Sequence, residues 1–227
     1  MQYNVLTGSI PPTFEFLESL LKLNISHNGL TGNIPSRIFN LTSLIEISFW
    51  NNSLLGSLPM DICFNLPMLE RLRISMNQLG GNIPSSLGAC MSLKLLSLSY
   101  NNFVGSIPTE IGKLSKLQKL YLRRNNLTAS LKTINIPNEI GNLLALVYLD
   151  YLHGQIPEFI FNLSMLQALS LAGKSISGNL PSSIDNGLPN LERLLLSGNQ
   201  LSGEIPASMS NFSKLTKLDL GENFFSG

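Results

Sequence analysis

The chain has 227 residues, of which 44% are hydrophobic and only 13% are charged, and its formal net charge is +1. So weak an overall charge argues against nucleic acid as the main partner, because phosphate binding needs a basic surface. The longest uninterrupted apolar stretch, at about residues 143–149, is far shorter than the roughly 20 residues that cross a bilayer. We therefore expect no direct membrane insertion by this chain.

An Asn-x-Leu-(Thr/Ser)-Gly-x-Ile-Pro phrase recurs along the chain, in most places every 24 or 25 residues. A fixed period in this range predicts a solenoid, in which each coil packs only against its neighbours. We expect one elongated domain rather than separate globular ones. Its expected units are a partial repeat at 1–16, complete repeats at 17–40, 41–65, 66–89, 90–113, 114–142, 143–162, 163–187 and 188–211, and a partial repeat at 212–227.

The first half of each repeat predicts a short strand followed by a structural asparagine. In repeat 17–40, Leu23 and Ile25 are two residues apart, so both point inward while the residues between and beside them face solvent. Asn28 follows, and its amide can donate to and accept from buried backbone groups that would otherwise cost about 1–3 kcal/mol each. The equivalent asparagines form the expected asparagine ladder: Asn28, Asn52, Asn77, Asn101, Asn125, Asn199 and Asn223.

The second half of each repeat returns the chain to the next strand. Its glycine permits a tight turn, and its proline fixes an extended path along the opposite face. A short helical or 3₁₀ segment, such as residues 36–40, closes the coil. The predicted fold is an α/β solenoid, a curved right-handed superhelix with a parallel β-sheet on the concave face and 3₁₀ or short helices and loops on the convex face.

Two consecutive repeats depart from the common length. Repeat 114–142 has five extra residues around 129–135, and repeat 143–162 has only 20 residues. In the next repeat Lys174 stands where the asparagine should be, and we expect it to point outward because a buried lysine is costly. The pattern predicts a local defect in the stack from about residue 129 to 176. A functional loop and a degenerate copy or faulty gene model are the alternatives.

With its repeats aligned, nearly the whole chain resembles plant-type leucine-rich repeats. The phrases Ile-Gly-Asn-Leu at 140–143 and Leu-Asp-Leu-Gly-Glu-Asn at 218–223 are similar to the ectodomains of plant leucine-rich-repeat receptor-like kinases. The resemblance implies a module that binds a peptide or protein ligand in defence or developmental signalling, with a leucine-rich-repeat co-receptor as a possible second partner. Receptor-like proteins without a kinase and secreted inhibitors of cell-wall-degrading enzymes use the same repeat and stay as alternatives.

The resemblance also implies a location at the extracellular face of the plasma membrane, as part of a longer receptor, with secretion into the apoplast as the alternative. The paired cysteines that cap such ectodomains are missing, and both ends fall inside a repeat, so we expect a fragment. Gly-x-Gly-x-x-Gly, His-Arg-Asp and Asp-Phe-Gly are also missing, so we expect no kinase chemistry, no other catalytic residues and no cofactor in this chain.

Asn-x-(Ser/Thr) sequons support an extracellular location. The candidate glycosylation sites are Asn40, Asn126, Asn162 and Asn211. Three of them, Asn40, Asn162 and Asn211, share one position in their repeats on the convex side, where a glycan would leave the sheet free. The sequons at Asn24 and Asn51 lie on or beside the strand face and are poorer candidates.

The outward strand positions of the second to fifth complete repeats concentrate charge and aromatic side chains, the types enriched at binding hot spots. The candidate ligand-binding residues on the concave face are Trp50, Arg71, Arg73, Tyr100, Lys119, Tyr121, Arg123 and Arg124. A polar strand face that is merely solvated is the competing interpretation. Arg71-Leu-Arg73 also resembles the Arg-x-Arg pair with which some peptide-hormone receptors hold a ligand's terminal carboxylate, since guanidinium groups suit bidentate carboxylate contacts.

The remaining chemistry-bearing residues suggest no further site. His27 and His153 are far apart in sequence and have no serine or cysteine partner in a catalytic arrangement, and no spacing suits a metal. Cys90 occupies a leucine position, which predicts a buried free thiol rather than a reactive one. A disulfide to Cys63, on the convex segment one coil earlier, is also possible and depends on geometry.

Overall fold

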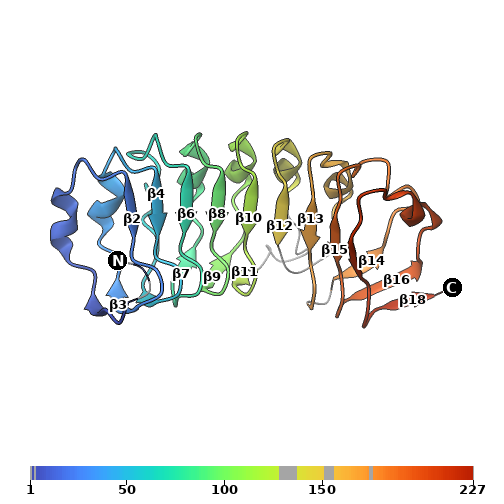
Figure 1. Ribbon diagram of the computed structural model, residues 1–227, viewed down its shortest axis with the longest axis horizontal. Coiled ribbons are helices and arrows are strands. Elements are labelled where there is room, and N and C mark those ends of the chain that lie inside the picture. The colour runs from blue at the N-terminus through green and yellow to red at the C-terminus, as the bar shows by residue number, and fades with distance from the viewer. Residues whose placement is uncertain (1, 3, 128–136, 151–155, 174–175, 227) are drawn as a thin grey trace.

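The computed structural model describes residues 2, 4–127, 137–150, 156–173 and 176–226, and these form a row of stacked coils (Figure 1). One strand of each coil joins a nine-stranded sheet. Its strands are β2 (Lys22–Asn24), β4 (Glu46–Ser48), β6 (Arg71–Arg73), β8 (Leu95–Ser97), β10 (Lys119–Tyr121), β12 (Tyr148–Asp150), β13 (Ala168–Ser170), β15 (Arg193–Leu195) and β17 (Lys217–Asp219). They pair in chain order and all in parallel, as the repeat predicts.

A second row of short strands follows the ladder asparagines. They are β1 (Thr7–Ser9), β3 (Gly29–Asn33), β5 (Ser53–Leu55), β7 (Gly80–Asn82), β9 (Asn102–Gly105), β11 (Asn126–Leu127), β14 (Ser177–Asn179), β16 (Gln200–Glu204) and β18 (Phe224–Ser226). The repeat pattern predicted only a turn there. Glycines such as Gly32 and Gly105 have φ of 74° and 72°, a conformation that a β-carbon would hinder. They let the backbone turn while it still pairs with the strand of the neighbouring coil.

The convex side consists of 3₁₀ helices, each beginning after a proline. They are η1 (Pro12–Phe16), η2 (Ser36–Asn40), η3 (Ser85–Ala89), η4 (Thr109–Lys113), η5 (Asn138–Asn142), η6 (Glu158–Asn162) and η7 (Ala207–Asn211). In each, the carbonyl of the preceding proline accepts an N–H three residues on, as from Ile38 to Pro35 at 3.1 Å. Every helix within the described residues is of this short type. None of them is long and apolar enough to cross a membrane.

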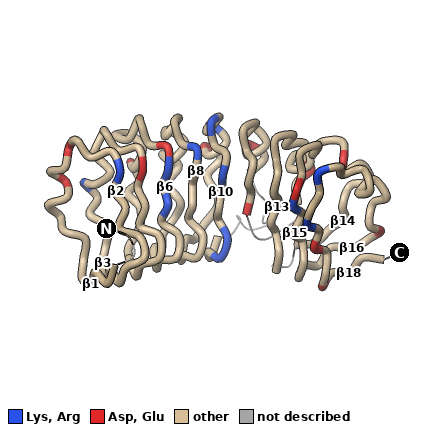
Figure 2. Tube along the Cα trace, viewed as in Figure 1, with Lys and Arg blue, Asp and Glu red and all other residues tan. Residues whose placement is uncertain are grey.

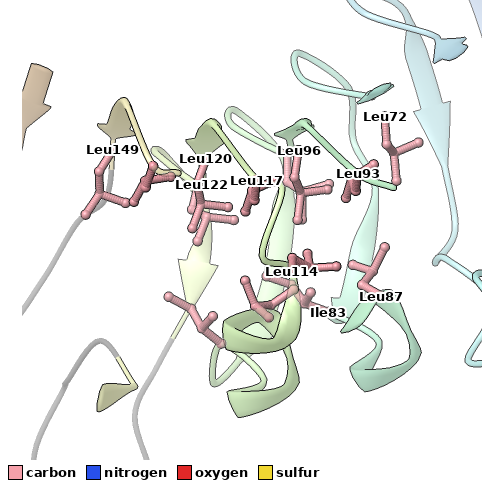
Figure 3. Packing of buried hydrophobic residues seen from close by; sticks show 14 of the residues in the cluster. Leu72, Ile83, Leu87, Leu93, Leu96, Leu114, Leu117, Leu120, Leu122 and Leu149 are labelled. Atoms are coloured by element: carbon pink, nitrogen blue, oxygen red, sulfur yellow. The ribbon is translucent and has the colours of Figure 1, made fainter. Parts of the chain in front are cut away.

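The core is a ladder of leucine and isoleucine side chains between the sheet and the 3₁₀ helices. In the nine-stranded sheet, the middle residue of every strand from β2 to β15 is buried, because strand side chains alternate between the two faces. Figure 3 shows Leu72, Leu96 and Leu120 in one row, with Leu87 and Leu114 facing them from the convex side. Each coil therefore covers the core of its neighbours, and the outward residues on either side of the middle one are fixed by this packing.

The asparagine ladder is a set of hydrogen bonds inside the turns. The Asn101 amide donates to the carbonyl of Leu98 at 3.0 Å and to that of Ile74, in the preceding coil, at 3.0 Å. Its Oδ1 accepts the N–H of Leu79 at 3.1 Å. The other six asparagines likewise donate or accept across coils, and each of the seven accepts one N–H from the coil before it.

The residue before each of the seven ladder asparagines has a left-handed backbone. Six such residues that are not glycine have φ between 52° and 58°: His27, Asn51, Met76, Tyr100, Arg124 and Glu222. Gly198 fills the position before Asn199, with φ of 68°. The turn imposes this left-handed conformation, because residue types as different as histidine, methionine and arginine adopt it.

Replacing Met76 by glycine is therefore expected to raise the free energy of unfolding by about 0.5 kcal/mol. A left-handed conformation costs a residue other than glycine about 1–2 kcal/mol, and the greater chain entropy of glycine offsets part of this gain. Met91→Gly is the matched control, since Met91 is another exposed methionine without a positive φ. Urea unfolding should show a stabilised Met76→Gly and a slightly destabilised Met91→Gly; the reverse order would contradict the interpretation.

Cys63 and Cys90 form a disulfide, with their Cα atoms 5.2 Å apart. The disulfide that the sequence left open is therefore formed, so Cys90 is not a free thiol, and its side chain is buried as expected. Cys63 follows Ile62 on the convex side, and Cys90 takes a leucine position at the end of the next coil. Packing between consecutive coils brings these two positions together, which the sequence spacing alone left open.

The irregular repeats leave the main sheet continuous. Strand β12 pairs with β10 on one side and with β13 on the other. The predicted defect thus stops short of the concave sheet. Within the described residues the ladder breaks between Asn125 and Asn199, and the second row of strands breaks between β11 and β14. The second row is also interrupted between β5 and β7, where a single bridge from Ser57 to Gly80 connects the two sheets. The insertion around 129–135, His153 and Lys174 lie outside the described residues.

Candidate functional site on the concave face

The outward residues of the nine strands form rows across the concave face. The strand register aligns Lys22, Glu46, Arg71, Leu95, Lys119, Tyr148, Ala168, Arg193 and Lys217 in a first row. It aligns Asn24, Ser48, Arg73, Ser97, Tyr121, Asp150, Ser170, Leu195 and Asp219 in a second. Figure 2 shows charged residues of both signs along this sheet, with lysine and arginine on β6 and β10.

Glu46 holds the two arginines of β6. Its carboxylate accepts a hydrogen bond from Arg73 at 2.9 Å and lies 3.9 Å from Arg71. The Glu46 side chain is only 14% exposed, whereas the arginine side chains are 37% and 39% exposed. The arginine pair is therefore not an empty carboxylate receptor, because a carboxylate of the protein already lies against it. Sequence reasoning missed Glu46, although its register position beside Arg71 was a usable signal.

A second ion pair lies at the start of the neighbouring strands. Lys94 donates to Glu70 at 2.8 Å, and Arg71 lies 3.8 Å from the same Glu70 carboxylate. The hydrogen bond from Lys94 lowers the pKa of Glu70, with the charges of Lys94 and Arg71 acting in the same direction. Together, Glu46 and Glu70 fix three basic side chains over β6 and β8.

Aromatic and basic side chains stack at the centre of the sheet. The rings of Tyr121 and Tyr148 have centroids 5.0 Å apart, and the guanidinium of Arg193 lies 5.2 Å from the Tyr148 centroid. Arg193 reaches Tyr148 past the intervening first-row residue, Ala168, because alanine is too small to block it. Burial raises the pKa of Tyr121, and the neighbouring Tyr148 and Asp150 add to the effect.

Asp150 lies beside this stack with its carboxylate partly uncompensated. Burial raises its pKa to about 6, and the charge of Arg123 opposes the shift. Within the described residues, neither Asp150 Oδ1 nor Arg123 Nε has a hydrogen-bond partner, and both atoms are buried. Asp150 therefore costs stability when it is ionised.

Replacing Asp150 by asparagine is expected to stabilise the protein at pH 7 and to leave it unchanged near pH 4. The folded-state pKa is raised above the unfolded one, so the wild type is favoured at low pH and loses stability as the pH rises through about 6. The full shift corresponds to at most about 3 kcal/mol. Solvent screening at this partly exposed site reduces our expectation to about 1–2 kcal/mol at pH 7.

Urea unfolding between about pH 4 and pH 7 measures this difference. Asp219→Asn is the control, since Asp219 occupies the same row on β17 but accepts a hydrogen bond from Ser197 at 2.8 Å. It should give no stabilisation at pH 7. An Asp150→Asn protein no more stable than the wild type at pH 7 would contradict the account.

Two further aromatic contacts extend the face toward the turns. His27 lies edge-on to Trp50, with centroids 4.2 Å apart, and its Nδ1 is 3.0 Å from the Asn51 amide nitrogen. The Arg124 guanidinium lies 5.4 Å from the Tyr100 ring centroid. His27, which the sequence analysis set aside, thus helps to position a predicted binding residue.

A groove of about 450 Å³ runs over the first half of the sheet. It brings together four of the predicted binding residues, Trp50, Arg73, Lys119 and Tyr121, with polar neighbours from five strands and turns. The full lining is Gln2, Asn24, Ser26, His27, Ser48, Trp50, Arg73, Leu95, Ser97, Lys119 and Tyr121. The other four predicted residues, Arg71, Tyr100, Arg123 and Arg124, lie outside its lining.

The four candidate glycosylation residues, Asn40, Asn126, Asn162 and Asn211, are all exposed. Asn40 and Asn162 end η2 and η6, and Asn211 ends η7, so these three share the convex side. Asn126 begins β11. The Asn211 amide nitrogen donates to Asp185 at 2.9 Å. An N-linked glycan would be attached to this same nitrogen.

The arrangement suits binding by contact and charge. Within the described residues, no group of three or more histidine, cysteine or acidic side chains could hold a metal. A sequence-family comparison matches the family described as Leucine Rich Repeat to residues 19–41, 68–90, 92–114, 116–143 and 190–212, more than half of the chain. The chain belongs to the leucine-rich-repeat family.

Solved structures place this leucine-rich-repeat chain beside plant receptor ectodomains. It is 33% identical to the plant peptide hormone receptor RGFR1 in complex with RGF2, with a TM-score of 0.89 over 99% of this chain and 35% of that one. It is also 33% identical to the Arabidopsis receptor kinase HAESA in complex with the peptide hormone IDA and the co-receptor SERK1, with a TM-score of 0.88 over 100% and 38%. The chain thus spans little more than a third of either receptor structure.

A plant ice-binding protein has the same fold, with 27% identity and a TM-score of 0.85 over 100% of this chain and 72% of that one. No curated protein matches the sequence. The leucine-rich-repeat fold is a ligand-binding, non-catalytic scaffold. The solved structures that resemble this chain include receptors of peptide hormones and a protein that binds ice.

Proposed function

We propose that the chain is the ligand-recognition part of the ectodomain of a plant leucine-rich-repeat receptor-like serine/threonine kinase, and that its concave face binds an extended peptide or protein segment. The observation that carries the proposal is the set of basic and aromatic side chains between Trp50 and Arg193 on the concave face. Ion pairs and ring contacts hold it in place over a groove. Arginine, tyrosine and tryptophan are the residues enriched at binding hot spots.

The proposed mechanism is docking onto a preorganised surface. The side chains stand on strands whose middle residues are buried in the core, so little conformational entropy is lost when a ligand binds. Parallel strands lie about 4.8 Å apart, and nine of them span about 40 Å. A fully extended peptide of about a dozen residues covers the same length.

The receptor context is part of the same proposal. The similarity to receptors in complex with peptide hormones supports a signalling role in defence or development. The HAESA complex, which includes a co-receptor, supports a co-receptor as second partner. A buried disulfide and exposed convex-side sequons support the extracellular face of the plasma membrane, since disulfides persist in oxidising compartments.

Selection from a library of random peptides of about twelve residues tests the proposal. The selected peptides should lose affinity by about tenfold or more on the double variant Trp50→Ser and Tyr121→Ser, because aromatic hot spots contribute about 2 kcal/mol or more each. Phe64→Ser is the control, since Phe64 is 68% exposed on the convex side. Selected peptides that lose affinity on Phe64→Ser and keep it on the double variant would place binding elsewhere and contradict the proposal.

A further inference from the structure

Six basic residues lie on or beside three neighbouring strands of the concave sheet. We define the basic zone as Arg71, Arg73, Lys94, Lys119, Arg123 and Arg124, on or next to β6, β8 and β10 (Figure 2). The acidic residues facing it are Glu46, Glu70 and Asp150. Six cations therefore face three carboxylates, in a chain whose total net charge is only +1.

The carboxylates compensate one side of the zone more than the other. Arg73 and Lys94 make ion pairs at 2.9 and 2.8 Å, and Arg71 lies within 4 Å of two carboxylates. In the described part of the chain, Lys119, Arg123 and Arg124 have no ion pair within 4 Å. The β10 side thus carries most of the uncompensated positive charge, with Asp150 as the carboxylate that interacts with Arg123.

The floor between the two sides of the zone is uncharged. Strand β8 presents Leu95 and Ser97 outward, between the arginines of β6 and Lys119 of β10. Lys119 and Arg73 line the same groove, with Leu95 and Ser97 between them. A ligand lying in this groove meets Arg73, already paired with Glu46, on one wall and Lys119, which has no ion pair within the described residues, on the other. The two walls are separated by two strand spacings or about 10 Å.

We propose that the ligand segment lying over β6, β8 and β10 is acidic, with aspartate or glutamate carboxylates as the groups that the basic zone recognises. This inference rests on the proposed peptide-binding function and names the class of peptide. Guanidinium and ammonium groups on two walls favour a carboxylate-bearing segment and disfavour a cationic one. Because Glu46 and Glu70 already hold β6, the ligand carboxylates are expected to depend most on Lys119 in the groove and on Arg124, which lies beyond the groove's lining, after the end of β10.

The probe is a fluorescent, proline-rich peptide of about twelve residues with two glutamates three positions apart. Residues three apart in a polyproline II helix lie about 9 Å from each other on one side, which matches the two walls. Peptides with glutamine or lysine in place of both glutamates are the comparison. Anisotropy at about 50 and 150 mM salt should show binding of the glutamate probe that weakens with salt, about tenfold weaker binding of the glutamine probe and none of the lysine probe.

The double variant Lys119→Gln and Arg124→Gln should bind the glutamate probe about fivefold or more weakly, since exposed ion pairs each contribute up to about a fivefold factor. Both side chains are exposed, so the fold should be retained. Lys22→Gln with Lys217→Gln is the matched control, because both lysines are exposed in the first row at the ends of the same sheet. This control should bind as the wild type does.

Equal binding of the glutamate and glutamine probes, or equal losses in the two double variants, would overturn the acidic-segment inference. If library peptides without acidic residues then still depend on Trp50 and Tyr121, the proposed function stands without it. If no peptide of any charge binds the concave face, the proposed function fails as well. Tighter binding of a polygalacturonate oligomer than of the glutamate probe, lost in the Lys119 and Arg124 variant, would replace the peptide by an acidic polysaccharide.

Discussion

Replacing Asn101 by alanine is expected to lower the free energy of unfolding by about 4 kcal/mol. Among the described residues, Asn101 Oδ1 is the one acceptor of the buried Leu79 N–H, and this unsatisfied donor costs about 1–3 kcal/mol. The Leu98 and Ile74 carbonyls keep the donors Asn125 and Asn77, so each of these two lost hydrogen bonds adds only about 1 kcal/mol. Asn101 joins two coils, so its loss should loosen the stack on both sides.

Asn102→Ala is the matched control for Asn101→Ala. Asn102 is the next residue and is also an asparagine, but it is exposed, and its amide makes only a 3.4 Å contact to the Gln78 carbonyl. Its loss should change the free energy of unfolding by less than about 0.5 kcal/mol. Urea unfolding of the two variants measures both values, and similar losses would contradict a structural role for the ladder.

Removing the Cys63–Cys90 disulfide is expected to cost about 3.5 kcal/mol. The bond closes a loop with a sequence separation of 27, and the entropy of such a loop in the unfolded chain sets this magnitude. Both sulfur-bearing side chains are buried, so the double variant Cys63→Ala and Cys90→Ala also loses packing. The measurement is the denaturation midpoint of the oxidised wild type against that of the double variant.

A reductant separates the two contributions to the disulfide prediction. It should lower the midpoint of the wild type and leave that of the double variant unchanged. Thiol titration under denaturing conditions should find no free thiol in protein secreted from cells. Two free thiols in the secreted protein, with a midpoint insensitive to reductant, would contradict the disulfide and weaken the support for an extracellular location.

The regular part of the fold could be predicted because every coil repeats the same pattern of inward-facing apolar residues and a structural asparagine. Leu23 and Ile25 two residues apart predict an inward-facing strand, and the same spacing returns at Leu72 and Ile74. Asn28 and its equivalents mark where buried backbone needs a partner. One repeat alone would not have distinguished a strand from other structures. The recurrence of the same spacing in successive repeats made the strand assignment secure.

The details of the site could not be predicted in the same way, because they depend on contacts between coils. The sequence shows Arg71 and Arg73 as a pair, yet Glu46, on the neighbouring strand, binds both. The contact of Arg193 with Tyr148 depends on the small Ala168 between them, which only the register shows. The residues of a single strand therefore indicated candidate binding residues, whereas residues on neighbouring strands determined which side chains these residues contact.

The central proposal is that a peptide lies along the concave sheet, and photo-crosslinking tests it most directly. A library-selected peptide carrying a benzophenone at successive positions would be irradiated with the protein, and the crosslinked residues mapped by mass spectrometry. We expect crosslinks to Trp50, Tyr121 and Tyr148 and their row neighbours, moving along the sheet as the label moves along the peptide. Crosslinks confined to the 3₁₀ helices of the convex side would contradict the proposal.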